Sequence, residues 1–482
     1  MTDKDKLFNS LEEAENFLNE QFGDGESFDV SIKHVFVKDL PVLCAYISGL
    51  VDGIVLTQLL SNMLPEEDVD IEDEKEYFEA YFNYQGRSEE TKREAILLAI
   101  LSGQVVFITK SGYGYVAEIR SYPGRTPEEP DNEKVIRGSR DGFIEGISQN
   151  AALIRRRIRN SNLRFELHKI SEIGQTDVAL AFIKGIANDE TLDKLRQRIG
   201  QIHHDGLTMT DKSLEEWLFK QKFHPVPFVR YTERPDITAA HLLEGHIAII
   251  VDTSPSVIIV PATVFHLLQH AEEYRQAPLI GTFVRFMRYF GAIMGLLLLP
   301  LWYVFATNPS LLPDALSFLG AKEKSHIPLL LQVLIGDIGI EFLRMAAIHT
   351  PSPLSTAMGL VAGVIIGQIA IDVGLFSSEV VLYTAVSAIL TFIIPSYELG
   401  ISIKLFRLVL IIMTGIWGVN GLFIGIFLLF TYLCSLRPMQ APYLWPLIPF
   451  FPKAMLRVLV RFPMTEDALR PYVVDSKQRK RS

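Results

Sequence analysis

The sequence predicts an α+β N-terminal region of two similar subdomains, followed by an all-α, multi-pass membrane domain. Residues 283–434 consist of long apolar runs with short polar breaks, and crossing a bilayer takes roughly 20 apolar residues. Before residue 275, short apolar strands alternate with helices, and one order of these elements occurs twice. A soluble core helix is rarely apolar on every side, so the second half indicates a membrane protein.

Charge and cysteine content narrow the class of protein. The net charge is −10, and the soluble part has no basic stripe, which argues against nucleic-acid binding. The two cysteines, Cys44 and Cys434, lie in apolar runs, so we expect buried thiols and no disulfide framework. The N-terminus lacks the apolar region of a signal peptide, so we expect the soluble half to stay in the cytoplasm.

Composition and patterning divide the chain into predicted parts. These are an acidic lead-in (1–30) with one helix (10–22), a soluble α+β subdomain (31–130), a linker helix region (131–160), a second α+β subdomain (161–275), a multi-pass membrane domain of four to six helices (276–451) and a basic cytoplasmic tail (452–482). The first subdomain is expected to contain strands at 35–37 and 42–47, helices at 52–63 and 89–102, and a hairpin of 104–109 and 113–120.

The two subdomains share one order of elements, which we interpret as an internal repeat. The strand Val42–Gly49 aligns with Val178–Gly185, and the hairpin strand 103–108 aligns with 245–250. A helix at 190–202 follows the second strand just as one follows the first. Chance likeness between short apolar strands is the alternative.

A basic cluster, Arg155 to Arg157, lies on the linker helix between the subdomains. One interpretation is a patch for nucleic acid or lipid headgroups. The interpretation that we favour is a charged helix whose arginines pair with neighbouring acidic residues.

Arginines mark the cytoplasmic side of the first predicted span, residues 289–307. Arg275, Arg285 and Arg288 precede it, and positive residues flank spans on the cytoplasmic side. Pro300 is expected to kink this helix. The basic tail places the C-terminus on the same side and therefore predicts an even number of crossings.

The second apolar run, 327–343, contains two acidic residues on one helical face, Asp337 and Glu341. A charge at the centre of a membrane helix costs about 2.5–3.5 kcal/mol, so such residues face a protein interior or a water-filled path. Alternatively, they lie at the cytoplasmic end of the run, where Arg344 pairs with them.

The third predicted span, 356–374, combines small residues with two polar ones. Its glycines lie in helical register and predict close helix packing; they are Gly359, Gly363 and Gly367. Acidic groups lower the entry barrier for cations in channels. The candidate ion pathway therefore consists of Asp337, Glu341, Gln368 and Asp372.

The remaining apolar runs leave the number of crossings open. The fourth span, 379–395, carries Thr384, Ser387 and Thr391 as possible lining groups. The last run, 408–434, is interrupted by glycines and is either one tilted span or a tight hairpin or re-entrant pair. Lys404 and Arg407, which precede it, are expected to mark the cytoplasmic side.

The chain carries no recognisable catalytic, cofactor or metal motif. There is no phosphate loop and no nucleophile elbow. His266 and His270 are four residues apart, but Leu267 stands where a zinc protease needs glutamate. We therefore expect no enzyme, no cofactor and no metal site.

Several motifs resemble the A-subunits of the GerA-type spore germinant receptors, over roughly residues 35–455. The matching segments are 136–140, 153–158, 254–261, 282–288, 335–354 and 359–374. The resemblance implies a role in germination at the inner spore membrane and assembly into homo-oligomeric, ion-conducting channels. It also implies action with a small membrane partner, and possible association with other germination proteins, to amplify early ion release.

Two functions from different classes follow. In the first, the chain is a channel-forming subunit that releases monovalent cations across the lipid bilayer. In the second, it is a non-conducting scaffold that clusters other germination proteins. A transporter for small solutes is a third, weaker hypothesis, because broken apolar segments also mark substrate sites.

Overall fold

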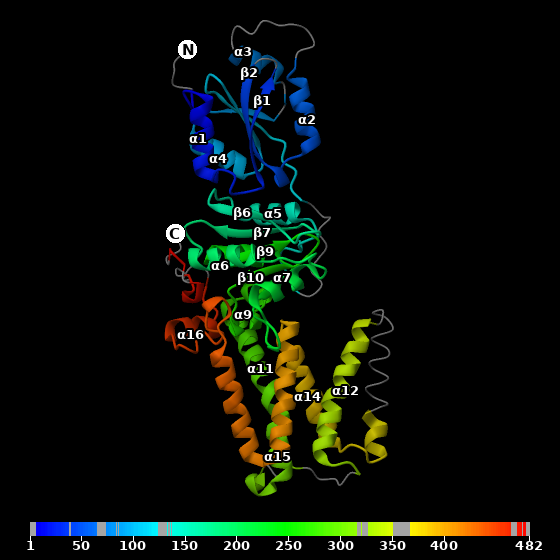
Figure 1. Cartoon of the computed structure of the whole chain (residues 1–482). Coiled ribbons are helices and arrows are strands. Elements are labelled where there is room, and N and C mark those ends of the chain that lie inside the picture. Colours follow the sequence, from blue (N-terminus) through cyan, green and yellow to red (C-terminus); the bar gives the residue numbers. More distant parts are fainter. Residues whose placement is uncertain are drawn as a thin grey trace. The chain divides into compact units, whose positions relative to one another are not determined.

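The chain forms two compact units, shown in the computed structural model of Figure 1. The α+β unit comprises Met1–Lys222, Val229–Pro261 and Thr465–Ser482, and the helical unit comprises Phe223–Phe228 and Ala262–Met464. The structure describes all residues except 1–5, 38–39, 65–73, 83, 85, 124–132, 134, 136, 316–319, 321–325, 350–366, 464–469, 475 and 479–482, and except the side chains of 79, 347–349 and 472.

The first half of the α+β unit is a five-stranded antiparallel sheet in the order β1-β2-β4-β5-β3. Helices cover both faces, so β4 is buried at every position. Its alternate residues Val106 and Ile108 pack with α1 and α4, whereas Val105 and Phe107 pack with α2 and α3. The elements are α1(Leu11–Phe22), β1(Val30–Val37), β2(Leu40–Ile47), α2(Gly53–Asn62), α3(Glu74–Tyr81), β3(Arg87–Glu90), α4(Arg93–Leu101), β4(Val105–Thr109) and β5(Gly114–Ala117).

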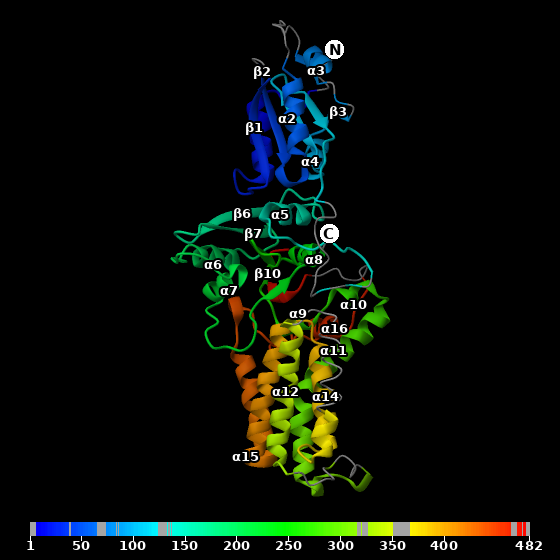
Figure 2. The same ribbon diagram turned by 90° about the vertical axis from the view of Figure 1, so that its right-hand side faces the viewer.

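The second half is another five-stranded antiparallel sheet, in the order β6-β7-β9-β10-β8 (Figure 2). Its inner face packs Phe165 of β6 and Ile250 of β9 against Ile154 of α5 and Leu242 of α8. The elements are α5(Ile147–Arg155), β6(Leu163–Ile170), β7(Thr176–Ile183), α6(Asp189–Ile199), α7(Thr210–Phe219), β8(Arg230–Thr232), α8(Pro235–Glu244), β9(Ile247–Val251) and β10(Val257–Val260). Short 3-10 helices lie at Ser48–Leu50, Pro309–Leu311, Pro438–Gln440 and Tyr472–Val474.

The internal repeat is confirmed, because the two sheets have the same strand order when the strands are numbered within each half. The prediction missed three edge strands, β3 in the first half and both β6 and β8 in the second. The helix predicted from residue 89 was wrong at its start: it begins at Arg93, because Arg87–Glu90 pairs instead with β5.

Helix α1 lies within the segment predicted as an acidic lead-in, and it contributes to the first core. Ser10 caps its N-terminus by accepting a hydrogen bond from the Glu13 amide. Leu18 and Phe22 are buried against β2 and β4. The segment from residue 6 onward therefore belongs to the hydrophobic core on one face of the first sheet.

The arginine cluster on α5 pairs with acidic residues, as the favoured interpretation predicted. Arg155 is buried and binds Asp29, and Arg157 binds Asp141. Arg156 lies 4.8 Å from the ring centroid of Tyr122. Two of the three guanidinium groups are thus neutralised within the unit.

The two cysteines differ in burial. Cys44 is buried in β2, as predicted, and burial raises the pKa of its thiol to about 12. The prediction for Cys434 was wrong, because this residue is only half-buried near the end of its helix. Both thiols are free.

The buried imidazole of His246 is expected to make the second sheet sensitive to acid. Burial lowers its pKa from 6.5 to about 4, although the carbonyl of His241 accepts a hydrogen bond from its Nδ1. The folded state therefore favours the neutral ring, and stability is lost as the pH falls from 6.5 towards 4. The lowered pKa corresponds to about 3 kcal/mol of stability.

Hydrogen-exchange protection of the β9 amides, corrected for intrinsic rates, measures this loss in the full-length protein. His246→Phe is expected to flatten the pH dependence. His203→Gln is the matched control, because the side chain of His203 is 77% exposed in the same half of the unit. An unchanged pH slope in His246→Phe would contradict the assignment.

The described part of the helical unit contains both long helices and short ones. They are α9(Val264–Leu268), α10(Ala271–Arg275), α11(Pro278–Thr307), α12(Leu329–His349), α14(Ser378–Phe392), α15(Tyr397–Ser435) and α16(Pro452–Leu459), and residues 367–372 are also helical. Within the described part of the chain, two helices are long and apolar enough to cross a membrane, α11 and α15. α12 has sufficient length but carries Asp337, Glu341 and Arg344.

The first predicted span differs from the structure in length, and the third lies mostly outside the described residues. The first is longer than predicted, because α11 already begins at Pro278 and includes Arg285 and Arg288. Both arginines therefore lie within the helix and do not precede it. Their side chains are buried and pair with Glu273. Most of the third span, including Gly359 and Gly363, lies outside the described residues.

Helix α15 is a hairpin, which was one of the two alternatives for the last apolar run. Gly418 has φ 59° and ψ −139°, so the helix breaks there. A Cβ atom on Gly421 would lie 2.0 Å from the carbonyl oxygen of Met413, and one on Gly425 would lie 2.6 Å from Leu410. Residues before and after Gly418 therefore face each other at close range, and Figure 1 shows the two limbs side by side.

Gly418→Ala is expected to destabilise the helical unit by about 1–3 kcal/mol, since an L-residue avoids this backbone conformation. Thermal unfolding in detergent measures the effect. Gly339→Ala is the matched control: no neighbouring atom lies within 4 Å of its added Cβ, and alanine is the better helix former by about 0.5–1 kcal/mol. Equal stability of the two variants would contradict the hairpin at Gly418.

Candidate functional site: an ion-pair ladder among the helices

A buried ion pair joins α12 to the first limb of α15. The Nη2 of Arg407 lies 2.5 Å from Oδ1 of Asp337, and its Nε lies 3.2 Å from Oδ2. The side chains are 1% and 0% exposed. This two-point geometry matches the guanidinium fork to the carboxylate and fixes the relative positions of the two helices.

The remaining donor of Arg407 is held by α11 and α14. Its Nη1 donates to the carbonyl oxygen of Gly295 at 2.7 Å, to Ser387 Oγ at 2.7 Å and to Thr391 Oγ1 at 3.0 Å. Gly295 permits this approach, because a Cβ there would lie 3.3 Å from Thr391 Oγ1. Four helices thus converge on one guanidinium.

A second ion pair lies one helical turn away. Lys404 Nζ is 2.8 Å from Glu341 Oε2, and Arg344 Nε is 2.9 Å from Glu341 Oε1. Asp337 and Glu341 are four residues apart and Arg407 and Lys404 are three apart, so consecutive turns of antiparallel helices bring the pairs into register. We call the pairs Asp337–Arg407 and Glu341–Lys404 the ion-pair ladder.

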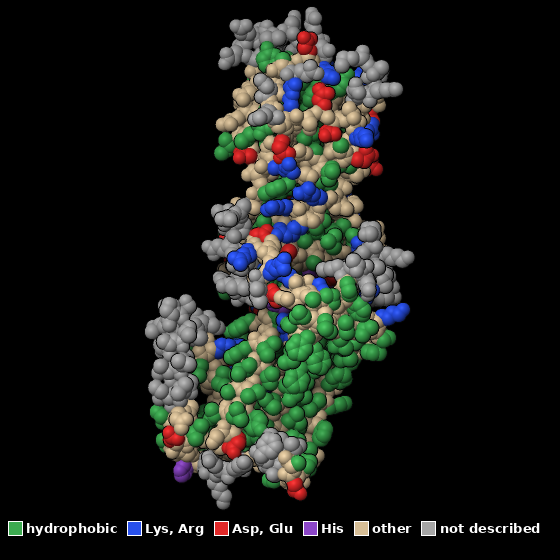
Figure 3. Space-filling view, turned by 180° about the vertical axis from the view of Figure 1, so that it is seen from behind, with side chains coloured by type: hydrophobic (Ala, Val, Ile, Leu, Met, Phe, Trp, Pro, Cys, Tyr) green, Lys and Arg blue, Asp and Glu red, His purple; other side chains and the backbone are tan. Residues whose placement is uncertain are grey.

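Apolar side chains form the outer surface of the helical unit, and the charged groups of the ladder lie inside it. Figure 3 shows a broad hydrophobic surface over one face of the helical unit. Large exposed side chains contribute to the apolar exterior of α11 and α15; they include Phe283, Phe286, Phe290, Ile293, Ile416, Phe423 and Phe427. This distribution is the inverse of a water-soluble bundle and suits lipid outside with functional polar groups inside.

The structure brings together two of the four candidate pathway residues. Asp337 and Glu341 share the face of α12 that meets α15, and Arg344 pairs with Glu341 as one alternative predicted. Gln368 and Asp372 are exposed instead, and the Gln368 amide donates to Asp372 at 3.1 Å. Gly367 is described, and its added Cβ would lie 4.0 Å from Val381.

The sequence predicts Ser387 and Thr391 as polar lining groups, and both accept hydrogen bonds from Arg407. It does not predict that Lys404 and Arg407 pair with the acids of α12. Positive residues commonly mark the cytoplasmic boundary, which is why the sequence predicts Lys404 and Arg407 there, whereas the structure pairs them with the two acids of α12. The spacing of the two cations was the available signal: three residues apart, like four for the two acids on α12, puts both groups on one helical face, and a charged pair inside an apolar helix needs partners.

The histidine and glutamate residues that resembled a metal helix have other roles. His266 takes part in the capping box of α9, and His270 caps α10 by accepting from the amide of Glu272. Glu273 is buried between Arg285 and Arg288. Among the described residues, no group of three His, Cys, Asp or Glu side chains is arranged to hold a metal ion.

The α+β unit with its duplicated sheet is joined to apolar helices that enclose paired charges, an arrangement that suits a membrane-associated protein. The sequence profile of the Bacillus/Clostridium GerA spore germination protein family matches residues 16–473. The chain therefore belongs to the GerA family, and the resemblance predicted from its motifs is confirmed.

Two relatives of known family, both from Bacillus subtilis, agree with this assignment. Stage V sporulation protein AF of Bacillus subtilis is 46% identical over 99% of this chain and 98% of its own. Spore germination protein KA of the same species is 30% identical over 97% of this chain and 88% of its own. The crystal structure of the N-terminal domain of the A subunit of the Bacillus megaterium germinant receptor GerK3 covers 53% of this chain and 96% of that domain, with 28% identity and a TM-score of 0.41.

Proposed function

We propose that this chain is a channel-forming subunit that releases monovalent cations across the inner spore membrane and amplifies the germination response. The observation that supports this most is the ion-pair ladder, because charged groups enclosed by apolar helices are costly and commonly mark ion pathways. In this proposal the helical unit crosses the membrane several times, and the α+β unit faces the spore core.

The ladder suggests how such a channel stays closed. Asp337 and Glu341 would lower the entry barrier for cations, as acidic rings do in cation channels. Arg407 and Lys404 occupy these carboxylates in the present arrangement. Opening then requires α12 to move relative to the first limb of α15, which exchanges each protein cation for a mobile one.

Assembly belongs to the same proposal. A single copy presents Gln368 and Asp372 as exposed groups, and homo-oligomerisation would place these groups at the wall of a shared pathway. A small membrane partner, together with other germination proteins, would set the open state. Relatives carry names of germination and sporulation proteins, which suits this setting.

The same pairing favours a second function, a non-conducting scaffold for other germination proteins. Charges that are fully paired need no mobile ion. Ion flux separates the two functions, because a scaffold conducts under no condition, whereas a closed channel conducts once its partner is present.

The test is potassium efflux from liposomes that contain the purified protein, with and without co-expressed membrane partners. The proposal expects efflux that falls in Asp337→Asn and in Asp372→Asn. Unchanged efflux in both variants would remove these acids from the pathway. No efflux under any pairing would support the scaffold.

A further inference from the structure

The loop between α7 and β8 has the composition of a membrane-interface anchor. Lys220, Lys222 and Phe223 lie in its first four residues, which we call the tip, and the side chain of Phe223 is fully exposed, at 102% of its reference area. Leaving a phenylalanine in water forfeits the stabilisation that burial of its ring would give. We propose that this tip inserts Phe223 at the surface of the bilayer and that its two lysines bind anionic lipid headgroups.

The tip is held at one end of the α15 hairpin. Residues 223–228 belong to the helical unit: the carbonyl of Pro225 accepts a hydrogen bond from Ser402, and His224 Nδ1 lies 3.1 Å from the hydroxyl of Tyr432. Ser402 lies near the start of the first limb and Tyr432 near the end of the second. Phe223 is therefore fixed close to the open end of the hairpin.

The length of the limbs places this end opposite the bend. From Gly418, sixteen residues lead back to Ser402 and fourteen lead on to Tyr432, which correspond to about 24 Å and 21 Å of helix. The hydrocarbon core is about 30 Å thick. If the hairpin lies in the bilayer with its bend near one face, the tip lies near the other.

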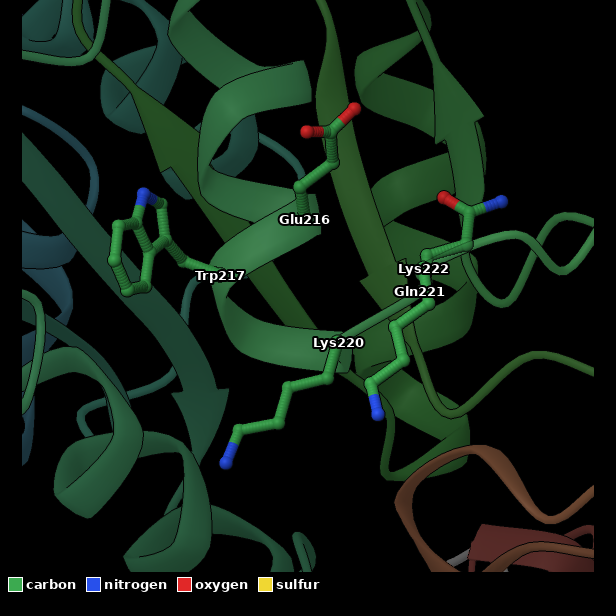
Figure 4. A pocket seen from close by; sticks show the side chains of 5 residues that line it. All are labelled: Glu216, Trp217, Lys220, Gln221 and Lys222. Carbon is green, nitrogen blue, oxygen red and sulfur yellow. The ribbon is translucent and has the colours of Figure 1, made fainter.

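Chain continuity keeps the lysines close to Phe223. Lys222 is adjacent to Phe223, and consecutive Cα atoms are about 3.8 Å apart. Lys220 is two residues further, at the left-handed C-cap of α7. Figure 4 shows both lysine side chains extending to the same side, away from Glu216, around a hollow of about 400 Å³. Trp217, which is 43% exposed, lines the same hollow.

The lysine and aromatic side chains of the tip favour an anionic membrane surface as its partner. Lysine and aromatic side chains are enriched at membrane interfaces, where the ring lies among the headgroups and the ammonium meets phosphate. Each lysine near an anionic surface is worth about a fivefold change in binding. A neutral protein surface would leave both ammonium groups uncompensated.

The experiment labels Phe223→Cys with an environment-sensitive fluorophore in a full chain with both native cysteines replaced by alanine, in nanodiscs. We expect strong quenching by headgroup-proximal spin-labelled lipid and weak quenching by aqueous iodide. Removing anionic lipid, or introducing Lys220→Gln and Lys222→Gln together, is expected to weaken lipid quenching severalfold. Ile173→Cys, at a site 76% exposed in the α+β unit, is the control and should respond to iodide alone.

Other outcomes overturn the proposal. Iodide quenching equal to that at residue 173 would place the tip in water, and protection from both quenchers would place it under a protein. Lipid quenching that ignores the lysines and the anionic lipid would overturn headgroup recognition. Phe427→Cys, at a site 68% exposed in the second limb, must be quenched by deep spin-labelled lipid. Its failure would instead contradict the membrane location of α15, on which this inference and the proposed function both rest.

Discussion

Replacing Arg407 with glutamine is expected to lower the free energy of unfolding of the helical unit by about 3–5 kcal/mol. The variant leaves the carboxylate of Asp337 buried without its guanidinium, and an uncompensated buried charge is far more costly than a lost surface pair. It also removes the donor that the Gly295 carbonyl, Ser387 and Thr391 share. Unfolding in detergent, followed by circular dichroism, measures the loss.

Two further variants separate the effect of the Asp337–Arg407 ion pair from the effect of lost side-chain packing. Asp337→Asn combined with Arg407→Gln removes both charges, so the double variant is expected to be more stable than the sum of the single effects predicts. Lys404→Gln is the matched control, because Glu341 is 21% exposed and keeps Arg344 as a partner. Strict additivity of the two single variants would show that the pair is not coupled.

Replacing Arg155 with methionine is expected to destabilise the α+β unit by a similar amount, about 3–5 kcal/mol. Its Nε and Nη2 each lie 2.9 Å from a carboxylate oxygen of Asp29, and its Nη1 donates to the carbonyl of Leu163 at 3.1 Å. The arginine is fully buried. Asp29 precedes β1 and Leu163 begins β6, so one guanidinium connects the two sheets of the repeat.

Hydrogen exchange at the amides of β1 and β6 in the full chain measures this effect. Arg157→Met is the matched control on the same helix, because its pair with Asp141 is about one-fifth exposed and is expected to contribute less than about 1 kcal/mol. Arg155→Lys is also expected to lose stability, since lysine cannot make the two-point contact. Equal effects of the Arg155 and Arg157 variants would refute the connecting role.

Local patterning predicted most of the α+β unit. Strands such as β2, β4, β7 and β9 are continuous apolar runs, because helices cover both faces of each sheet. Three edge strands escaped prediction, namely β3, β6 and β8, and for two of them the sequence shows the reason. β3 reads Arg-Ser-Glu-Glu, which resembles a helix start, and β8 is three residues long. Edge strands gain their conformation from pairing with a neighbour, which local sequence does not encode.

The ion-pair ladder in the helical unit also depends on contacts that local sequence does not encode. The helical period placed Asp337 and Glu341 on one face, and the structure has them there. Their partners Arg407 and Lys404 lie about 60–70 residues away in sequence, and a pairing at that distance depends on how the helices pack. The break at Gly418 was visible as a glycine in an apolar run, but its direction follows from the close approach of the two limbs.

The central claim is that the ladder holds a cation pathway closed, and one comparison tests it most directly. Potassium efflux is measured in liposomes with equal amounts of folded Arg407→Gln and Asp337→Asn protein. The account predicts that Arg407→Gln, which leaves the carboxylate free, raises efflux on the order of tenfold, as a barrier change of about 1.4 kcal/mol would. Asp337→Asn, which leaves the positive guanidinium, is predicted to lower efflux. Efflux that changes in the same direction in both variants, or in neither, would contradict the claim that the ladder holds a cation pathway closed.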